Sequence, residues 1–530
     1  MNMRTKTEVS TRQVNQDGLN LKALAAAVAA AFWSHGALAL PTGGQVTQGN
    51  SVISTPNATT MNINQTTGTS VINWDTFNIA KPESVIVTQP VGGSALYRVG
   101  AQSPSEIFGV LRATGSIVLS NPAGVYFMPG SSVDVKGLVA TSLSISDDSF
   151  LSGNWVFSNG GGAGTVSNSG TITALGGYAV LAGPTVQNDG IINARMGTVA
   201  LAAGDQVKLD MVGDGLISVQ VPTAALNAVA INKGTLQADG GNVLMTARSA
   251  NAILDTVVNS EGVIRADSIG MSNGVIVLDG GTAGVVSVSG TGSLSAQGSD
   301  AGTTGGTVKM LGDKVGLFDS ASINASGQAG GGTVLVGGNY QGKGPEQNSS
   351  ATVFASGASI NADAVTNGNG GKIILWSNGS TRAHGTLTAR GGSSGGNGGL
   401  VETSGHWIDI AGVRVDTSAA AGTRGLWLID PFDVTIVDGI AAGSTLGAFD
   451  AGNPNTWAPS ATGSTVTDGD INLNLVTADV TITTTNGGGA EAGNITVSNG
   501  VVITNGAVAA RTLTLAADGA AGGIIVNGNA

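Results

Sequence analysis

The stretch NSGTITALGGYAVLA, residues 168–182, recurs almost at once as NDGIINARMGTVALA, residues 188–202. Each copy holds an Asn-x-Gly turn, a short strand that alternates polar and apolar residues, one or two glycines, and a second strand. Related copies begin at Asn232 and Asn259, and glycine pairs open later strands at Gly305, Gly331, Gly370 and Gly398. Because strands this short cannot bury a core alone, their repetition predicts that neighbouring copies stack on one another.

The architecture that fits this repeat is an all-β, right-handed parallel β-helix with an N-terminal cap and a short extra-helical segment. Asn suits the turns because its side chain bonds to nearby backbone, and Gly suits corners that need positive φ. The spacing predicts coils of about 20–25 residues, and hence about 20 coils stacked into a rod. A propeller would need longer periods and an aromatic residue marking each blade, and the sequence shows neither.

The composition excludes several classes of protein. Of 530 residues, 85 are Gly and none is Cys, while only 11% are charged and the formal net charge is −12. A chain without cysteine has no disulfide framework, zinc finger or thiol catalysis. Its acidic balance makes it a poor partner for nucleic acid. The 41% of hydrophobic residues argues against a disordered chain.

The N-terminal residues 1–39 have the order of a secretory signal peptide. Basic residues such as Arg4 and Lys22 precede an apolar run at 23–33, and Ala37 and Ala39 form an A-x-A cleavage site. The apolar run is shorter than the roughly 20 residues that span a membrane. We therefore expect an exported chain that starts near residue 40 and has no membrane span.

The segment from 40 to 160 is less repetitive and carries local signals of its own. The sequence SPSE at 103–106 resembles a capping box and predicts a short helix over 107–112. The sequence NPAG at 121–124 predicts a tight turn between two strands. We expect Trp74 and Phe77 to cover the open N-terminal end, because solenoids need a cap.

The same segment resembles a known family, the two-partner secretion domain of filamentous haemagglutinin-type exoproteins, and within it the high-molecular-weight adhesin subgroup. The resemblance lies in VINW at 71–74 with FNI at 77–79, and in the NPNG-like NPAG at 121–124. The family's Asn-Arg-Val is replaced by Tyr-Arg-Val at 97–99. Further stretches at 336–346, 401–412 and 427–437 are similar to segments of large members.

This resemblance implies a secreted adhesin rather than an enzyme. Such a chain crosses the periplasm of a Gram-negative bacterium, is recognised by POTRA modules of a dedicated outer-membrane β-barrel transporter, and folds at the cell surface or beyond. The N-terminal β-helix then acts as secretion signal and folding nucleus, while the host-cell or carbohydrate receptor stays open. The residues implied in transporter recognition or domain folding are Asn73, Trp74, Phe77, Asn78, Asn121, Pro122 and Gly124.

The predicted organisation has four parts. Residues 1–39 are the signal peptide, and 40–300 are the two-partner secretion (haemagglutination-activity) domain. Residues 301–437 are shaft repeats, and 438–530 are further repeats that read as uncapped or truncated, with a loop at 451–460.

Possible chemical sites are weak, and we expect no catalytic residue, cofactor or metal. The segment 337–344 nearly spells a nucleotide-binding P-loop, but Gly344 stands where a Ser or Thr should bind Mg²⁺. Glu402, His406 and Asp409 read as exposed polar residues at a coil corner. If extended, the adjacent Asp147 and Asp148 point to opposite faces and make a poor carboxylate pair.

One alternative function stays open, an extracellular β-helical polysaccharide lyase or hydrolase. Such an enzyme needs clustered acids and a basic residue along one groove. The 22 Lys and Arg residues are scattered, which favours the adhesin. A toxin-delivery exoprotein would need a C-terminal effector domain.

Overall fold

The computed structural model describes residues 40–162, 164–210, 217–250, 256–440, 463–484, 491–506, 510–517 and 521–528. The predicted signal peptide with Ala37 and Ala39, and the predicted loop at 451–460, lie outside these described residues. Residues 40–530 form one compact unit.

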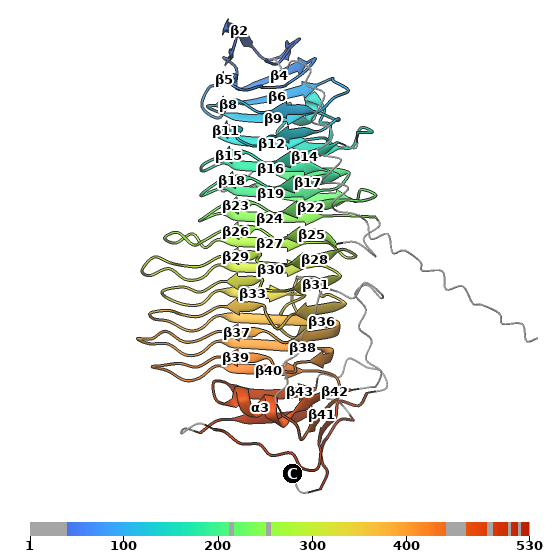
Figure 1. Cartoon of the computed structure of the whole chain (residues 1–530), viewed down its shortest axis with the longest axis vertical. Helices are drawn as coiled ribbons and strands as arrows, with labels where there is room; N and C mark the ends of the chain where they lie inside the picture. The colour runs from blue at the N-terminus through green and yellow to red at the C-terminus, as the bar shows by residue number, and fades with distance from the viewer. Residues whose placement is uncertain are drawn as a thin grey trace, which may run out of the picture. The chain divides into compact units, whose positions relative to one another are not determined.

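Within this unit the chain winds into a parallel β-helix, as predicted (Figure 1). Successive coils contribute short strands to a sheet of 14 strands, and each strand pairs with the strand of the next coil. A typical step joins Ile172 to Ile192, and the next joins Ile192 to Leu236. The parallel strands of this sheet are β3 (Thr60–Gln65), β5 (Ser84–Thr88), β8 (Val110–Ala113), β11 (Ser132–Asp134), β15 (Thr171–Thr173), β18 (Ile191–Asn193), β23 (Thr235–Gln237), β26 (Val263–Arg265), β29 (Ser293–Ser295), β32 (Ser322–Asn324), β35 (Ser359–Asn361), β37 (Thr386–Thr388) and β39 (Arg414–Asp416).

A second ladder of longer strands runs beside the first and belongs to a 25-stranded sheet. Residues of these strands alternate between the central core and an outward face, as Val199 and Ala200 do. Its members are β4 (Thr69–Trp74), β6 (Ser94–Val99), β9 (Ser116–Ser120), β12 (Gly137–Thr141), β16 (Tyr178–Gly183), β19 (Thr198–Ala203), β24 (Asn242–Ala247), β27 (Val275–Asp279), β30 (Thr307–Leu311), β33 (Thr333–Val336), β36 (Lys372–Ala383), β38 (Leu400–Asp409), β40 (Leu426–Asp430), β43 (Asp479–Thr484) and β45 (Leu513–Ala517).

A third ladder completes the coils and shares the 25-stranded sheet, because β36 and β38 are long enough to reach both ladders. Its strands are β7 (Ser105–Ile107), β10 (Val125–Phe127), β14 (Thr165–Asn168), β17 (Thr185–Asn188), β22 (Val229–Asn232), β25 (Thr256–Ser260), β28 (Val285–Val288), β31 (Lys314–Leu317) and β34 (Ala351–Phe354).

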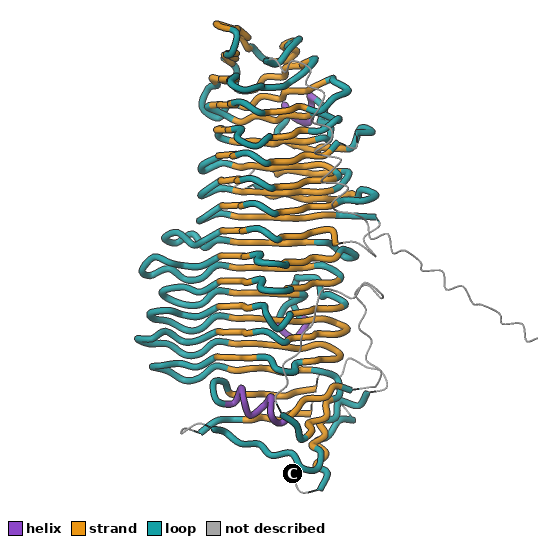
Figure 2. Tube along the Cα trace, viewed as in Figure 1, coloured by secondary structure: helices purple, strands orange, loops and turns teal. Residues whose placement is uncertain are grey.

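Coil length differs from the prediction. The step from Ile172 to Ile192 is 192 − 172 = 20 residues, but the step from Leu294 to Ile323 is 323 − 294 = 29. The extra residues lie in loops such as the one between Asn361 and Lys372, and the loops are visibly longer from β26 onward (Figure 2). Because each longer coil uses more residues, the described residues form fewer coils than the predicted number of about 20, and that prediction is wrong.

Buried asparagines form a ladder inside the corner after the third set of strands. Asn168, Asn188 and Asn232 are fully buried. The Nδ2 of Asn168 donates to Oδ1 of Asn188 at 2.8 Å, and Asn188 donates in turn to Asn232 at 2.9 Å. Burying an amide requires such partners, because an unpaired polar group loses its bonds to water. The Asn-x-Gly repeat therefore supplies interior side chains as well as turns.

The N-terminal end is covered by two antiparallel strands. Strand β1 (Gln45–Gln48) pairs with β4, and β2 (Ser51–Asn57) pairs with β3. Trp74 and Phe77 lie buried beneath this cap, as members of the main core. The prediction that these two rings themselves close the end is therefore wrong, because backbone from the preceding residues does so.

The helix predicted over 107–112 is absent, and β7 and β8 occupy that segment. Strand β7 pairs in parallel with β10, and β8 pairs in parallel with β5 on one side and β11 on the other. Such backbone pairing outweighs a local capping signal, because it also places Ile107 and Leu111 in the core. The turn predicted at 121–124 is confirmed, since the Gly124 N–H donates to the Asn121 carbonyl at 2.9 Å.

An extra-helical layer covers part of the outward face, as predicted. It consists of α2 (Asp147–Leu151) and the antiparallel strands β13 (Asn154–Ser158), β20 (Gln206–Asp210) and β21 (Ser218–Thr223). Phe150, Trp155 and Phe157 pack there on outward residues of the second ladder, and these side chains form a second apolar core.

The C-terminal described residues add a further small sheet, which contains β41 (Val434–Val437), β42 (Ser464–Thr467), β44 (Ile495–Val497) and β46 (Ile524–Val526). The helix α3 (Asp468–Leu475) follows β42, whereas the 3-10 turn η2 (Tyr340–Gly342) lies earlier in the chain, between β33 and β34. Helix α3 is capped by Thr467, whose hydroxyl accepts the N–H of Asp470 at 3.1 Å.

Candidate functional site at the N-terminal end

Three of the residues singled out from the sequence line one hollow near the N-terminal cap. Asn73 and Trp74, at the end of β4, and Pro122, in the turn after β9, border a cavity of about 380 Å³. The other lining residues are Gly43, Gln45, Asp75, Arg98, Val99, Gly100, Ser120 and Ser144. Segments about 50 residues apart in the sequence, 73–74 and 122, thus meet at one place.

Arg98 holds this hollow to the extra-helical layer. Its guanidinium donates to Asn73 Oδ1 at 3.2 Å, to the Ile145 carbonyl at 2.9 Å and to Asp147 Oδ1 at 2.7 Å. Arg98 and Asp147 are each about one-third exposed, with 32% and 34% of their side chains accessible. The hollow, which we call the motif pocket, therefore has a positioned cation on its wall.

An aromatic cluster forms the base of the motif pocket. The Trp74 ring meets Phe77 edge-on at a centroid distance of 5.4 Å and Tyr97 at 5.9 Å. Burial raises the pKa of Tyr97 far above its ordinary value, so the phenol stays neutral. Edge-on pairs of this kind stabilise a core beyond the area they bury. Phe77 thus supports Trp74 from within and does not line the pocket.

The remaining predicted residues converge on strand β7 instead. Asn78 Oδ1 accepts the N–H of Glu106 at 2.9 Å. On the other side of the same strand, the Asn121 amide donates to Ser105 Oγ at 3.1 Å and the Gly124 carbonyl accepts the Ser105 N–H at 3.0 Å. The two resemblance motifs are therefore joined through β7, which fixes the turn that carries Pro122.

Gly124 is required by geometry. Its φ is +119°, and a Cβ at this position would lie 2.7 Å from the Thr165 carbonyl oxygen. The Asn121 side chain stabilises the same turn by accepting the Ala123 N–H at 3.0 Å. Because position 123 contributes its backbone N–H here, the change from Asn to Ala leaves this bond intact.

Arg98 and Asp147 are site residues that were not predicted from the sequence. Arg98 lies in the Tyr-Arg-Val motif at 97–99, so the sequence did contain a signal that could have identified it. Asp147 and Asp148 both lie in the first turn of α2, whose N-cap is Ser146, so the extended arrangement considered for them does not occur. The Ser146 hydroxyl accepts the Ser149 N–H and starts this helix.

The weak chemical motifs do not assemble into one site. Segment 337–344 contains the single turn η2, and Lys343 Nζ donates to Gln341 Oε1 at 3.1 Å. Glu402 is fully buried within β38, so the prediction of an exposed corner residue is wrong. His406 pairs with Glu491, while Asp409 contacts His384 at 3.3 Å. Among the described residues no group of three or more His, Asp or Glu could hold a metal ion.

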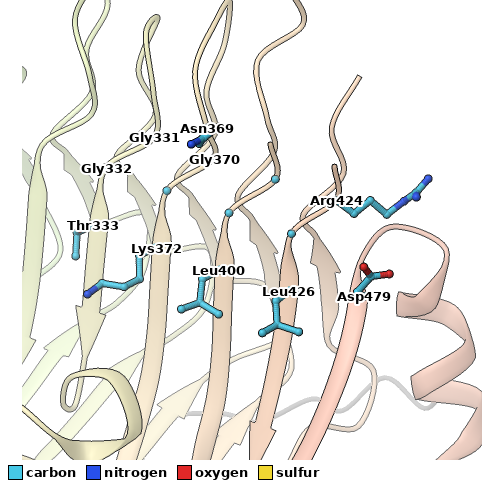
Figure 3. Close-up of a pocket in the computed structure, with 14 residues that line it drawn as sticks. Gly331, Gly332, Thr333, Asn369, Gly370, Lys372, Leu400, Arg424, Leu426 and Asp479 are labelled. Carbon is cyan, nitrogen blue, oxygen red and sulfur yellow. The ribbon is translucent and has the colours of Figure 1, made fainter. Parts of the chain in front are cut away.

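A second hollow, of about 600 Å³, follows the glycine pairs along four later coils (Figure 3). Its floor is formed by glycines that precede β33, β36, β38 and β40. Asn369, Arg424 and Asp479 border it (Figure 3). A Cβ on Gly399 would lie 2.1 Å from the Gly371 carbonyl oxygen, so the small residues here are needed for coil stacking.

Comparison with known proteins agrees with the resemblance drawn from the sequence. The model of the TPS secretion domain matches residues 37–296. The crystal structure of the HMW1 secretion domain from Haemophilus influenzae superposes with a TM-score of 0.63 and 28% identity, covering 74% of this chain and all of that chain.

Two curated relatives are heme/hemopexin-binding proteins of Haemophilus influenzae. The one from strain Rd (ATCC 51907 / DSM 11121 / KW20) is 31% identical over 249 residues, which are 45% of this chain. The other is 26% identical over 254 residues, or 43% of this chain. The matched part is 27% of the length of each relative.

The chain also has no membrane-spanning helix among its described residues, since none is both long and apolar enough. The match over 37–296, the parallel β-helix and the similarity to a solved secretion domain agree with one another. Residues 37–296 therefore form a TPS secretion domain, and the chain is a two-partner secretion substrate that is secreted to the cell surface or the extracellular space.

Proposed function

We propose that the motif pocket is where this chain is recognised by its outer-membrane transporter during export. The observation that carries the proposal is the convergence of Asn73, Trp74 and Pro122 on one hollow. These residues come from two separate motifs, and the pocket presents polar groups beside a buried aromatic base. Recognition sites are commonly concave, mostly apolar and provided with a few oriented polar groups.

The transporter partner is expected to contact the chain through periplasmic POTRA modules. Arg98 offers N–H donors beyond those bonded to Asn73, Ile145 and Asp147, because a guanidinium carries five. A carbonyl or carboxylate of the partner is the group that such donors bind. The N-terminal coils that build the motif pocket are already formed when the transporter binds them, and the later coils fold outside in sequence, because each coil contacts mainly its neighbours.

The secreted product is proposed to act as an adhesin and not as an enzyme. Its long polar surface suits weak, repeated contacts with a host cell or carbohydrate. The names of the curated relatives give a second candidate for the whole protein, binding of heme or hemopexin. These two functions are separable by measuring binding of the secreted chain to hemopexin and to host cells in parallel.

The test of the transporter proposal uses the full chain in a heterologous Gram-negative host. We expect the chain in the medium or on the cell surface when the transporter is co-produced, and in the periplasm when it is omitted. A transporter with an inactive barrel but intact POTRA modules is the matched control. Equal export in the absence of the transporter contradicts the proposal.

A further inference from the structure

The stretches 336–346 and 401–412, which the sequence shares with large members of the family, meet on the outward face of the second ladder. Residues 337–350 leave the coil between β33 and β34 and lie over this face. The Gln341 N–H donates to both carboxylate oxygens of Glu402 at 3.1 Å. We call residues 337–350 the strap.

The strap follows one column of outward residues. Parallel register aligns Lys309, Leu335, Ile374, Glu402 and Leu428 in successive coils. Leu335 and Ile374 are only 2% and 0% exposed, although they face away from the main core. The strap also lies on Trp376, since a Cβ added to Gly342 would come within 2.6 Å of the indole.

The strap is anchored by ionisable groups at two positions along this column. At the first, Lys309 Nζ contacts Glu346 Oε1 at 2.8 Å, and Asn339 Nδ2 donates to the other Glu346 oxygen at 2.7 Å. At the second, Glu402 accepts the backbone N–H of Gln341 in the strap. Gln341 holds that N–H in place with a φ of +52°, a backbone region that residues other than glycine seldom adopt.

The pKa values of the two anchoring carboxyl groups are shifted in opposite directions. Burial raises the pKa of Glu346, but Lys309 and Asn339 outweigh it and hold that pKa below its ordinary value. Burial raises the pKa of Glu402 from its ordinary 4.5 to about 7, and the Gln341 N–H, the Ser404 hydroxyl and Lys372 offset this only in part. Asp430 on the next strand raises it further, and Tyr340 of the strap also lies within its electrostatic reach.

From this geometry we propose that residues 337–350 are a pH-dependent strap, which lies closed over Leu335 and Ile374 when Glu402 is protonated and is released when Glu402 ionises.

The direction follows from proton linkage. A group whose pKa is higher in the closed state takes up a proton on closing, so closure is most favourable below the ordinary pKa of 4.5. The advantage is lost as the pH rises through about 7, the value in the closed state. Loss of one proton over this interval lowers the ratio of closed to open strap by roughly two to three orders of magnitude, and the ratio levels off above it.

The test uses a nitroxide spin label on the full secreted chain. The chain has no cysteine, so Lys343→Cys places one label on the exposed part of the strap. We expect the mobile fraction to rise between pH 5 and pH 7.5 and then level off. Ser359→Cys, exposed on β35 away from the strap, is the matched label position and should show no change.

Two further variants make the outcome decisive. In Glu402→Gln the side chain cannot ionise but still accepts the Gln341 N–H, so the label should stay immobile at every pH. In Glu346→Gln the other anchor is weakened, so mobility should rise at every pH while the step between pH 5 and pH 7.5 persists. The proposal is overturned if mobility does not change with pH, or if the same step appears in Glu402→Gln.

Discussion

The side-chain amide of Asn168 donates to Oδ1 of Asn188, one coil further along, across 2.8 Å. Each of these amides also bonds to its own turn, since Asn168 Oδ1 accepts the Gly170 N–H at 3.1 Å. The same side chain therefore shapes a turn and links two coils. This double role explains why the Asn-x-Gly pattern marks the repeat.

The first prediction concerns this ladder. Asn188→Ala removes one acceptor of the Asn168 amide and the side-chain donor to the buried Asn232 Oδ1, so the ladder is interrupted at both neighbours. Losing such partners should lower the free energy of unfolding by about 2–4 kcal/mol. Urea denaturation of the secreted chain measures it. Asn193→Ala is the control, because the Asn193 side chain is only half-buried and accepts the nearby Arg195 N–H at 3.1 Å.

The second prediction concerns the glycines that open the strands. A Cβ on Gly197 would lie 1.9 Å from the Gly177 carbonyl oxygen, so Gly197→Ala forces two coils apart. Overpacking of this kind should lower the free energy of unfolding by about 1–3 kcal/mol. The matched change is Gly68→Ala, where an added Cβ meets nothing within 4 Å. Similar thermal midpoints for the two variants would refute the steric explanation.

The third prediction links folding to export. Val199 lies within β19 and is paired on both sides, with Ala179 and with Val243. Val199→Pro removes a backbone N–H from the ladder and should slow the appearance of the chain at the cell surface. Val199→Ala keeps that N–H and is the control. Pulse-chase secretion assays give the rates, and equal rates for both variants and the parent would show that folding does not drive export.

Much of the fold could be predicted because its determinants repeat locally. The alternation in NSGTITALGG and its copy twenty residues later fixes strand, turn and stacking direction together. The glycine pairs at Gly305, Gly331, Gly370 and Gly398 do precede strands, since a side chain there would meet the coil beside it. The turn at 121–124 was likewise predictable from Pro and Gly at fixed positions.

The rest depended on contacts that no local pattern encodes. Residues 107–112 have a capping signal, yet pairing with neighbouring coils makes them strands. Loop lengths set the coil number, and the repeat does not specify them. Arg98 gains its role from Asp147, 49 residues away in the sequence. The buried Glu402 looked like a surface residue, because the strap that covers it is 61 residues upstream.

The most direct test of the account is the fourth prediction, on the motif pocket. Full chains carrying Asn73→Ala together with Pro122→Ala lose two pocket-lining side chains and the Arg98–Asn73 bond, while the main core stays intact. In cells that make the transporter, we measure the fraction of chain outside the cell against that of the Asn193→Ala control. We expect at least a tenfold drop in the exported fraction for the pocket variant and little change for the control. Export of the pocket variant at the level of the parent chain would contradict it.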